Sequence, residues 1–93
     1  MKLGRVIGQA GLGAELDELP TPPEIFQLIK RAGRIRDAEM YHTFNMGVGL
    51  IVVCPESQAE RVIQAFNRHR QSARRIGRVE RQPGIRIRGK LLR

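Results

Sequence analysis

Tryptophan is absent from this sequence of 93 residues, and only four side chains are aromatic, one tyrosine and three phenylalanines. A chain of this length forms one domain at most and buries only about two thirds of its unfolded surface. We therefore expect a modest hydrophobic core. The scarcity of aromatics also weighs against a nucleic-acid surface, because such surfaces stack bases on exposed aromatic side chains beside basic ones.

Cysteine occurs once, at Cys54, which excludes an internal disulfide and a cysteine-rich metal site. Because Cys54 ends an apolar run, we expect a buried, unreactive thiol. His42 and His69 lack acidic or thiol ligands at metal-binding spacing, so we expect no metal site. No apolar run reaches the ~18 residues of a membrane span, and the N-terminus lacks the apolar stretch of a secretory signal. These absences predict a cytoplasmic protein with no membrane partner.

Positive charge is concentrated in one part of the chain. Residues 1–60 carry six Lys or Arg and eight Asp or Glu, whereas residues 61–93 carry eleven basic residues and one acid. A solvated arginine-rich surface explains this pattern, and so does a standalone basic module that binds nucleic acid or a phosphorylated ligand. Phe66, the one aromatic in this half, is expected on a buried helix face, which argues against nucleic acid. The candidate contacts of such a module are Arg74, Arg75, Arg78, Arg81, Arg86 and Arg88.

Three segments have the apolar spacing of amphipathic helices, at residues 21–33, 38–44 and 56–70. Proline fits the first turn of the first helix, and basic residues and Gly33 fit its end. An acceptor side chain at or next to the start of each segment predicts where its helix begins. These caps are Thr21, Asp37 and Ser57, with Glu24 and Glu60 completing two capping boxes.

Residues 48–54 are apolar throughout, which predicts a central strand covered on both faces. Residues 73–81 and 84–92 read as two further strands around a tight Gln-Pro-Gly turn. The predicted fold class is α+β, a two-layer arrangement in the order α-α-β-α-β-β, with helices packed on a small mixed sheet. Residues 1–19 are glycine-rich and read as an irregular lead-in to a partial domain at 20–93. Three helices are too few to cover the sheet, so we expect half of a larger α/β domain.

Polar residues and two glycines lie just before the apolar run. Thr43, Asn45, Gly47 and Gly49 are the candidate substrate-binding residues, with His42 as a further candidate. Glycine allows a ligand to approach closely, and backbone amides at such a turn can hold an anionic oxygen. A purely structural interpretation is also open, in which Gly47 ends a helix and Thr43 and Asn45 bond to local backbone. No complete set of catalytic residues is present.

One family carries this arrangement of motifs. Three features follow one another in the sequence: the stretch "PPEIFQLIKRAGRIRDAEMYHTFNMGVGLIVVCP", an amphipathic helix, and "ARRIGRVE". Together they resemble the end of phosphoribosylformylglycinamidine cyclo-ligase, also called aminoimidazole ribonucleotide synthetase. The resemblance covers about residues 20–80, and Met46 stands where many relatives have cysteine. The family's E-M-x-x-T-F-N-x-G-V-G core and late I-G pair correspond to Glu39, Met40, Thr43, Phe44, Asn45, Gly47, Val48, Gly49, Ile76 and Gly77.

The resemblance implies an ATP-dependent ligase that closes the imidazole ring in purine biosynthesis, converting formylglycinamidine ribonucleotide to aminoimidazole ribonucleotide, ADP and phosphate. It implies ATP and Mg²⁺ as cofactors of the full-length enzyme, bound mainly by its N-terminal domain. Accordingly, we expect this chain to be the C-terminal part of the enzyme's C-terminal domain, without a cofactor of its own and inactive alone. The expected partners are the missing N-terminal part, supplied as a separate polypeptide in a split enzyme, or a second copy in a homodimer.

Overall fold

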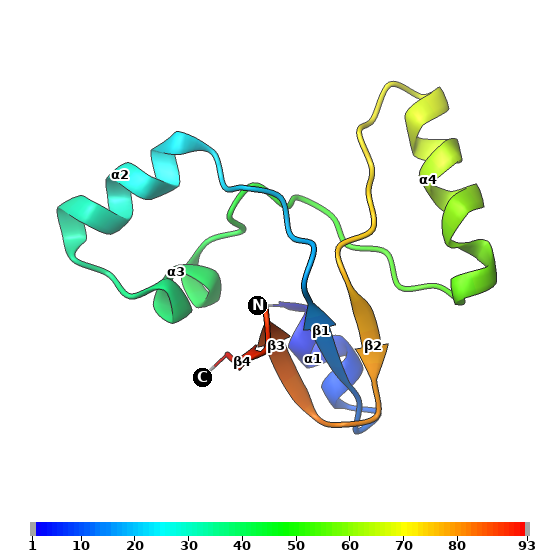
Figure 1. Ribbon diagram of the computed structural model, residues 1–93, viewed down its shortest axis with the longest axis horizontal. Coiled ribbons are helices and arrows are strands. Elements are labelled where there is room, and N and C mark those ends of the chain that lie inside the picture. The colour runs from blue at the N-terminus through cyan, green and yellow to red at the C-terminus, as the bar shows by residue number, and fades with distance from the viewer. Residues whose placement is uncertain (1, 93) are drawn as a thin grey trace.

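The computed structural model describes residues 2–92 as an α+β fold with helices on either side of a small, open mixed sheet (Figure 1). Its extents of 41 × 34 × 19 Å describe a flattened molecule. The α+β class predicted from the sequence is confirmed, although the order of elements differs. The elements are α1 (Lys2–Gly8), β1 (Gly13–Leu16), α2 (Glu24–Gly33), α3 (Asp37–Thr43), the 3₁₀ helix η1 (Glu56–Gln58), α4 (Ala59–Arg68), β2 (Arg78–Glu80), β3 (Gly84–Ile87) and β4 (Lys90–Leu91).

The sheet joins the two ends of the chain, in the strand order β2-β1-β3-β4. β1 is antiparallel to β2, with Ala14 opposite Val79, and parallel to β3, with Ala14 opposite Ile85. β4 is antiparallel to β3. The strands on either side of the Gln-Pro-Gly turn are therefore not neighbours, because β1 lies between them. The predicted strand at 84–92 divides into β3 and β4 around Arg88, whose φ of 49° turns the backbone.

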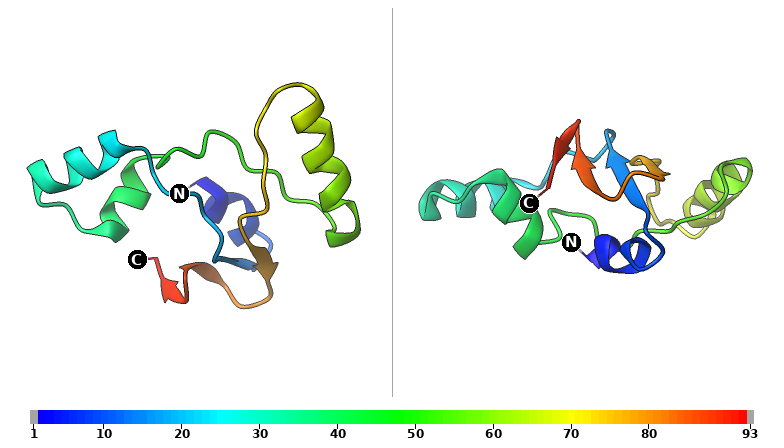
Figure 2. Two further views of the ribbon diagram at one scale, coloured as in Figure 1. Left: turned by 45° about the horizontal axis from the view of Figure 1, so that its top comes forward. Right: turned by 90° about the horizontal axis from the view of Figure 1, so that it is seen from below.

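Helix α1 covers one face of this sheet and supplies part of the main core, as Figure 2 shows from below. Leu3 and Ile7 lie four residues apart and therefore on one face of the helix. That face packs on the central strands, where alternate side chains point to the same side. The buried core comprises Leu3, Ile7, Ala14, Leu16, Leu19 and Ile85.

The prediction that residues 1–19 form an irregular lead-in is wrong. Glycines weaken an isolated helix because their helix propensity is low. In α1, the tertiary packing of Leu3 and Ile7 outweighs this low propensity of the glycines. Gly11, with φ 74°, then reverses the chain toward β1. The N-terminal segment supplies the central strand of the sheet and most of its core, so it belongs to the same folded unit as the C-terminal strands.

The helices α2, α3 and α4 lie close to their predicted positions, but the predicted caps are wrong. Their N-cap residues are Pro23, Arg36 and Gln58, and none makes a side-chain capping hydrogen bond. At the end of α2, Arg34 takes the left-handed conformation expected of a glycine, with φ 52°. The apolar periodicity of the sequence was therefore enough to locate these helices, although the predicted capping boxes do not form.

The predicted central strand at residues 48–54 is also absent, because the extended backbone has no paired neighbour within residues 2–92. The observed order adds α1 and β1 before α2 and lacks the strand after α3. Cys54 is half-buried, not fully buried as predicted. An extended run needs a partner strand to become part of a sheet, and this chain does not provide one here.

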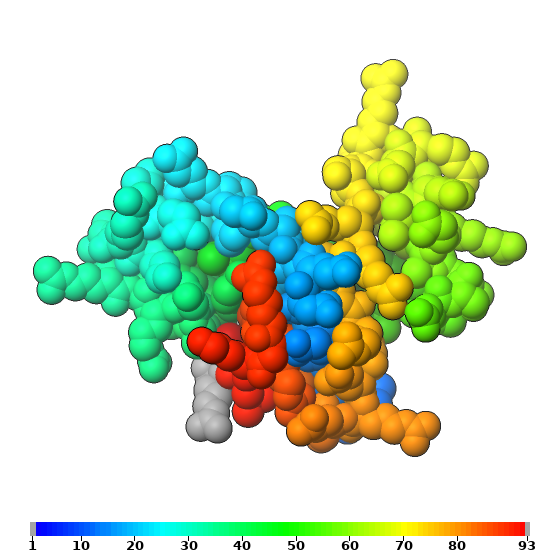
Figure 3. Space-filling view, in the orientation of Figure 1, coloured from blue at the N-terminus to red at the C-terminus, as the bar shows by residue number. Residues whose placement is uncertain are grey.

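Two parts of the molecule thus differ in packing. In the space-filling view of Figure 3, the helices of the middle of the chain form lobes on either side of the sheet. We call residues 2–19 and 76–92 the packed region, and residues 20–75 the central region. Helices α2 and α3 project to one side of the sheet, and α4 projects to the other (Figure 1). Helix α1, which the sequence did not predict, packs on the sheet, whereas the predicted helices α2 and α4 have no buried residue.

Candidate functional site

The candidate site is a turn at the end of α3. The helix ends at Thr43 because Phe44 has an extended backbone, with φ −117° and ψ 157°, while its N–H still donates to the Met40 carbonyl over 2.8 Å. Met40 is completely buried, and the adjoining Tyr41 packs against the main core. The residues that lead into the turn are thus fixed to the packed region.

The turn itself is closed by two hydrogen bonds. The Val48 N–H donates to the Asn45 carbonyl over 2.9 Å, and the Gly47 N–H donates to Asn45 Oδ1 over 2.9 Å. Met46 and Gly47 between them both have positive φ, 53° and 91°, as in a type I′ turn. Met46 is buried and anchors the turn. The predicted local bond of Asn45 is confirmed.

The five candidate residues occupy one short segment with exposed side chains or backbone. His42, Thr43, Asn45 and the two glycines are all exposed to solvent. A Cβ atom on Gly47 would lie 2.6 Å from Cδ of Pro23, whereas a Cβ on Gly49 would meet no atom within 4 Å. Gly47 is therefore required by the turn and by its contact with the residues before α2, and the backbone around Gly49 is open to an approaching molecule.

Aromatic packing holds this segment beside α2. The rings of Phe26 and Phe44 have centroids 5.9 Å apart and planes inclined at 59°, a tilted arrangement that aromatic pairs favour. Lys30 of α2 forms an ion pair with Asp37 at the start of α3. These contacts link α2 to α3 and to the residue that follows it, so the turn lies where this helix pair meets the core.

Two hollows in the described part of the chain lie away from the turn. They have volumes of about 410 and 320 Å³, lie beside α4 and are lined by residues between Gln64 and Gln71. Between residues 2 and 92, no three His, Cys, Asp or Glu side chains lie close enough together to hold a metal ion. None of the helices described there could cross a lipid bilayer. The candidate residues at the turn are exposed, and none of them lines either hollow.

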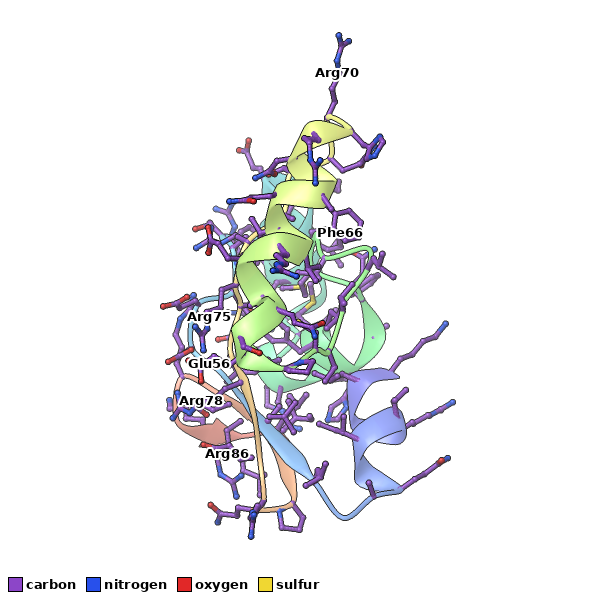
Figure 4. The ribbon with its side chains drawn as sticks, turned by 90° about the vertical axis from the view of Figure 1, so that its right-hand side faces the viewer. Glu56, Phe66, Arg70, Arg75, Arg78 and Arg86 are labelled. Atoms are coloured by element: carbon purple, nitrogen blue, oxygen red, sulfur yellow. The ribbon has the colours of Figure 1, made fainter. Side chains whose placement is uncertain are left out.

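Half of the arginines proposed for a basic binding module are engaged with carboxylates. Arg75 pairs with Glu56 over 3.4 Å, and Figure 4 shows these two residues near each other beside the lower end of α4. Arg78 contacts both Asp17 and Glu80, at 3.5 and 3.4 Å, and Arg86 lies 4.0 Å from Glu80. These pairs neutralise much of the charge on the outer face of the sheet, which weakens the interpretation of that face as an anion-binding surface.

Sequence reasoning missed the acidic residue at the centre of this face. Glu15 lies on β1, between its cross-strand neighbours Arg78 and Arg86. Its Oε1 accepts a hydrogen bond from the Gly89 N–H over 2.8 Å, and its Oε2 is buried without a hydrogen-bond partner among the described residues. The alternation of Ala14, Glu15 and Leu16 was the available signal, had residues 13–16 been recognised as a strand. Glu15 fastens the β3–β4 turn to the central strand.

Comparison with known proteins points to the same family as the sequence motifs. Residues 1–90 match the family described as AIR synthase related protein, C-terminal domain. Proteins named phosphoribosylformylglycinamidine cyclo-ligase are similar: that of Methanocaldococcus jannaschii is 45% identical over 64 residues, covering 69% of this chain and 18% of the relative. That of Sorangium cellulosum is 43% identical over 70 residues, covering 74% and 20%, and that of an Exiguobacterium species is 39% identical over 80 residues, covering 85% and 23%. The chain spans about a fifth of the length of these relatives.

Proposed function

The chain belongs to the AIR synthase related protein C-terminal domain family, and from this membership we propose that it forms part of the C-terminal domain of a phosphoribosylformylglycinamidine cyclo-ligase. The reaction implied by the resemblance consumes ATP and closes an imidazole ring, releasing ADP and phosphate. The proposed setting is the cytoplasm, as for a biosynthetic enzyme of small metabolites. The observation that carries the proposal is the family motif folded as an exposed turn on a buried anchor, Met40 and Met46.

We further propose that ATP and Mg²⁺ bind outside this chain, as the family resemblance implies. No cluster of three acidic, histidine or cysteine side chains lies within residues 2–92, and Asn45 already occupies the Gly47 amide that a phosphate would need. We therefore place the nucleotide on polypeptide outside this chain. The proposed partner is that remaining polypeptide, and the chain alone is expected to be inactive.

Within the completed enzyme, we assign the turn to the substrate side of the site. Thr43 and Asn45 are exposed and carry hydrogen-bonding groups that suit a polar ribonucleotide. Gly49 leaves its backbone accessible, because no atom lies within 4 Å of the position a Cβ would take. Gly47 shapes the turn, and His42 lies one residue before Thr43 on the exposed end of α3.

The test is a chimera in which this chain replaces the matching region of the Exiguobacterium relative. We expect the chimera to form aminoimidazole ribonucleotide from formylglycinamidine ribonucleotide and ATP, and the chain alone to form none. Asn45→Asp keeps the oxygen that holds Gly47 but removes the amide donors, and Thr43→Val removes a hydroxyl at nearly constant volume. Each should lower kcat/KM by about tenfold or more, the loss of one or two substrate hydrogen bonds.

Gln71→Ala serves as the matched control, because Gln71 is exposed and lies beyond the end of α4. It should leave kcat/KM unchanged. An active chimera whose Asn45 and Thr43 variants equal the control would overturn the site assignment, and turnover by the chain alone would overturn the division of the enzyme. A folded but inactive chimera would contradict the cyclo-ligase proposal itself.

A further inference from the structure

Phe44 lies between Thr43 and Asn45, the two polar side chains assigned to the substrate. The backbone is extended at Phe44, with φ −117° and ψ 157°, and successive side chains along an extended backbone point to opposite sides. In agreement, Phe44 is half-buried, whereas Thr43 and Asn45 are both exposed. A contact that holds the Phe44 ring therefore also fixes the direction in which the two polar side chains point.

Two residues at the start of α2 contact the turn. The ring of Phe26 lies 5.9 Å from that of Phe44, with the planes inclined at 59°. Gly47 lies so close to Pro23 that a Cβ atom there would come within 2.6 Å of the proline Cδ. The Phe26 N–H donates to the Pro23 carbonyl over 3.0 Å, so these two residues belong to one helical turn. The first turn of α2 thus contacts the site turn on either side of Asn45.

The Phe26–Phe44 pair lies apart from the main core. Among residues 2–92, neither ring is a member of the core cluster or of the half-buried side chains packed against it. Helix α2 has no fully buried residue, and Ile25 and Leu28 on the same helix are more than half exposed. The half-buried ring of Phe26 therefore acts mainly on Phe44 and contributes little to the packing of the sheet.

We propose that Phe26 is a positioning residue for the ribonucleotide-binding turn: its ring holds Phe44, and Phe44 sets the direction of Thr43 and Asn45. This role rests on the function proposed above, and it needs no contact between Phe26 and the substrate. Tilted aromatic pairs have a preferred geometry and are stabilised beyond the area they bury. Groups that bind a substrate lose much of their effect when they are displaced by as little as about 1 Å.

Amide hydrogen exchange of this chain measures the positioning directly, with Phe26→Leu as the disrupting variant and Phe66→Leu as its matched control. Phe66 is likewise half-buried, but it lies on α4, on the other side of the sheet. We expect Phe26→Leu to speed exchange of the Gly47 and Val48 amides, which close the turn, by about threefold or more. Phe66→Leu should leave both rates unchanged, and circular dichroism shows whether each variant keeps the wild-type fold.

The chimera described above measures the consequence for the substrate. Phe26→Leu should lower kcat/KM for formylglycinamidine ribonucleotide by about fivefold or more and leave the KM for ATP unchanged, because only the ribonucleotide side is displaced. Phe26→Tyr keeps the ring and should retain wild-type kinetics. Since the two rings act as a pair, the double variant of Phe26→Leu and Phe44→Leu should lose no more than the more severe single variant.

Equal exchange at the turn in Phe26→Leu and Phe66→Leu would overturn the positioning role. So would an active chimera in which Phe26→Leu equals the Phe66→Leu control, or in which it raises the KM of ATP and of the ribonucleotide alike. A folded but inactive chimera would contradict the cyclo-ligase proposal alone. The exchange rates of the chain would then still decide whether Phe26 positions the turn.

Discussion

The packed region and the central region contain similar kinds of apolar residues but use them differently. In the packed region, Leu16 is 2% exposed between α1 and the neighbouring strands, whereas Leu50 in the central region is 71% exposed. The central region fully buries only Met40 and Met46. The packed region closes on itself by bringing the two chain ends together, and the central region leaves its helices and its apolar run partly uncovered.

The contrast shows that a strong local pattern does not ensure that a segment is packed. Helix α2 is clearly amphipathic, yet Ile25 and Leu28 on its apolar face are 56% and 51% exposed. Helix α4 likewise has no buried side chain, and Figure 4 shows it extending away from the sheet toward Arg70. Most of a helix's stability in a protein comes from the surface it packs against. The central region therefore depends on surfaces that residues 2–92 do not supply.

The largest expected effect separates two leucines. Leu16→Ala should lower the free energy of unfolding by about 2–5 kcal/mol, because it removes a buried side chain and leaves a cavity in the core. Leu50→Ala should change it by less than about 0.5 kcal/mol, as exposed substitutions usually do. Urea unfolding followed by circular dichroism, in dilute protein, measures both. Equal losses would show that the two regions are equally packed.

A smaller difference is expected between two glycines, neither of which has positive φ. A Cβ at Gly77 would collide with the backbone carbonyl of Glu15 in the central strand, whereas one at Gly49 has open space. Gly77→Ala should therefore cost about 1–3 kcal/mol through overpacking, and Gly49→Ala should be neutral or slightly stabilising. Thermal and urea unfolding of the two variants would detect this difference. A destabilising Gly49→Ala would indicate that the turn is more crowded than the structure shows.

The smallest effects concern exposed ion pairs. Glu56→Gln removes the pair with Arg75, in which the glutamate is 83% exposed, and should change stability by less than about 0.5 kcal/mol. Asp17→Asn removes one partner of Arg78, which also contacts Glu80, and should cost at most about 1 kcal/mol. Both should be measured at low and high salt, because screening weakens surface pairs. A larger loss of stability for Glu56→Gln than for Asp17→Asn would reverse the order expected for the central and packed regions.

Sequence periodicity located the helices of the central region well, because their apolar spacing is a local property. It did not locate α1 and β1, since Gly4, Gly8, Gly11 and Gly13 obscured the spacing of Leu3 and Ile7 and the alternation around Glu15. The insertion of β1 between β2 and β3 is a pairing between distant segments, which local patterns do not encode. The core of the packed region was therefore the part least accessible from the sequence.

The apolar run at 48–54 predicted a strand with two covered faces, and the structure shows an unpaired segment in which Leu50, Val52 and Val53 are largely exposed. An apolar composition is typical of a strand that is covered on both faces, and residues 2–92 do not provide that cover. At the site, the sequence identified Asn45 and Gly47 as residues of a turn, and the structure confirms their hydrogen bond. Their positive-φ neighbour Met46 and the contact with Pro23 depend on tertiary packing and were not predicted.

Amide hydrogen exchange of the dilute monomer, resolved by residue, tests the difference between the two regions most directly. The amides that pair β1 with β2 and β3 should be strongly protected, because their opening requires disruption of the core. The amides of residues 50–53 should exchange nearly as fast as those of an unstructured peptide. Comparable protection of both sets in the monomer would contradict the account, since it would mean that the apolar run already pairs with a strand inside this chain.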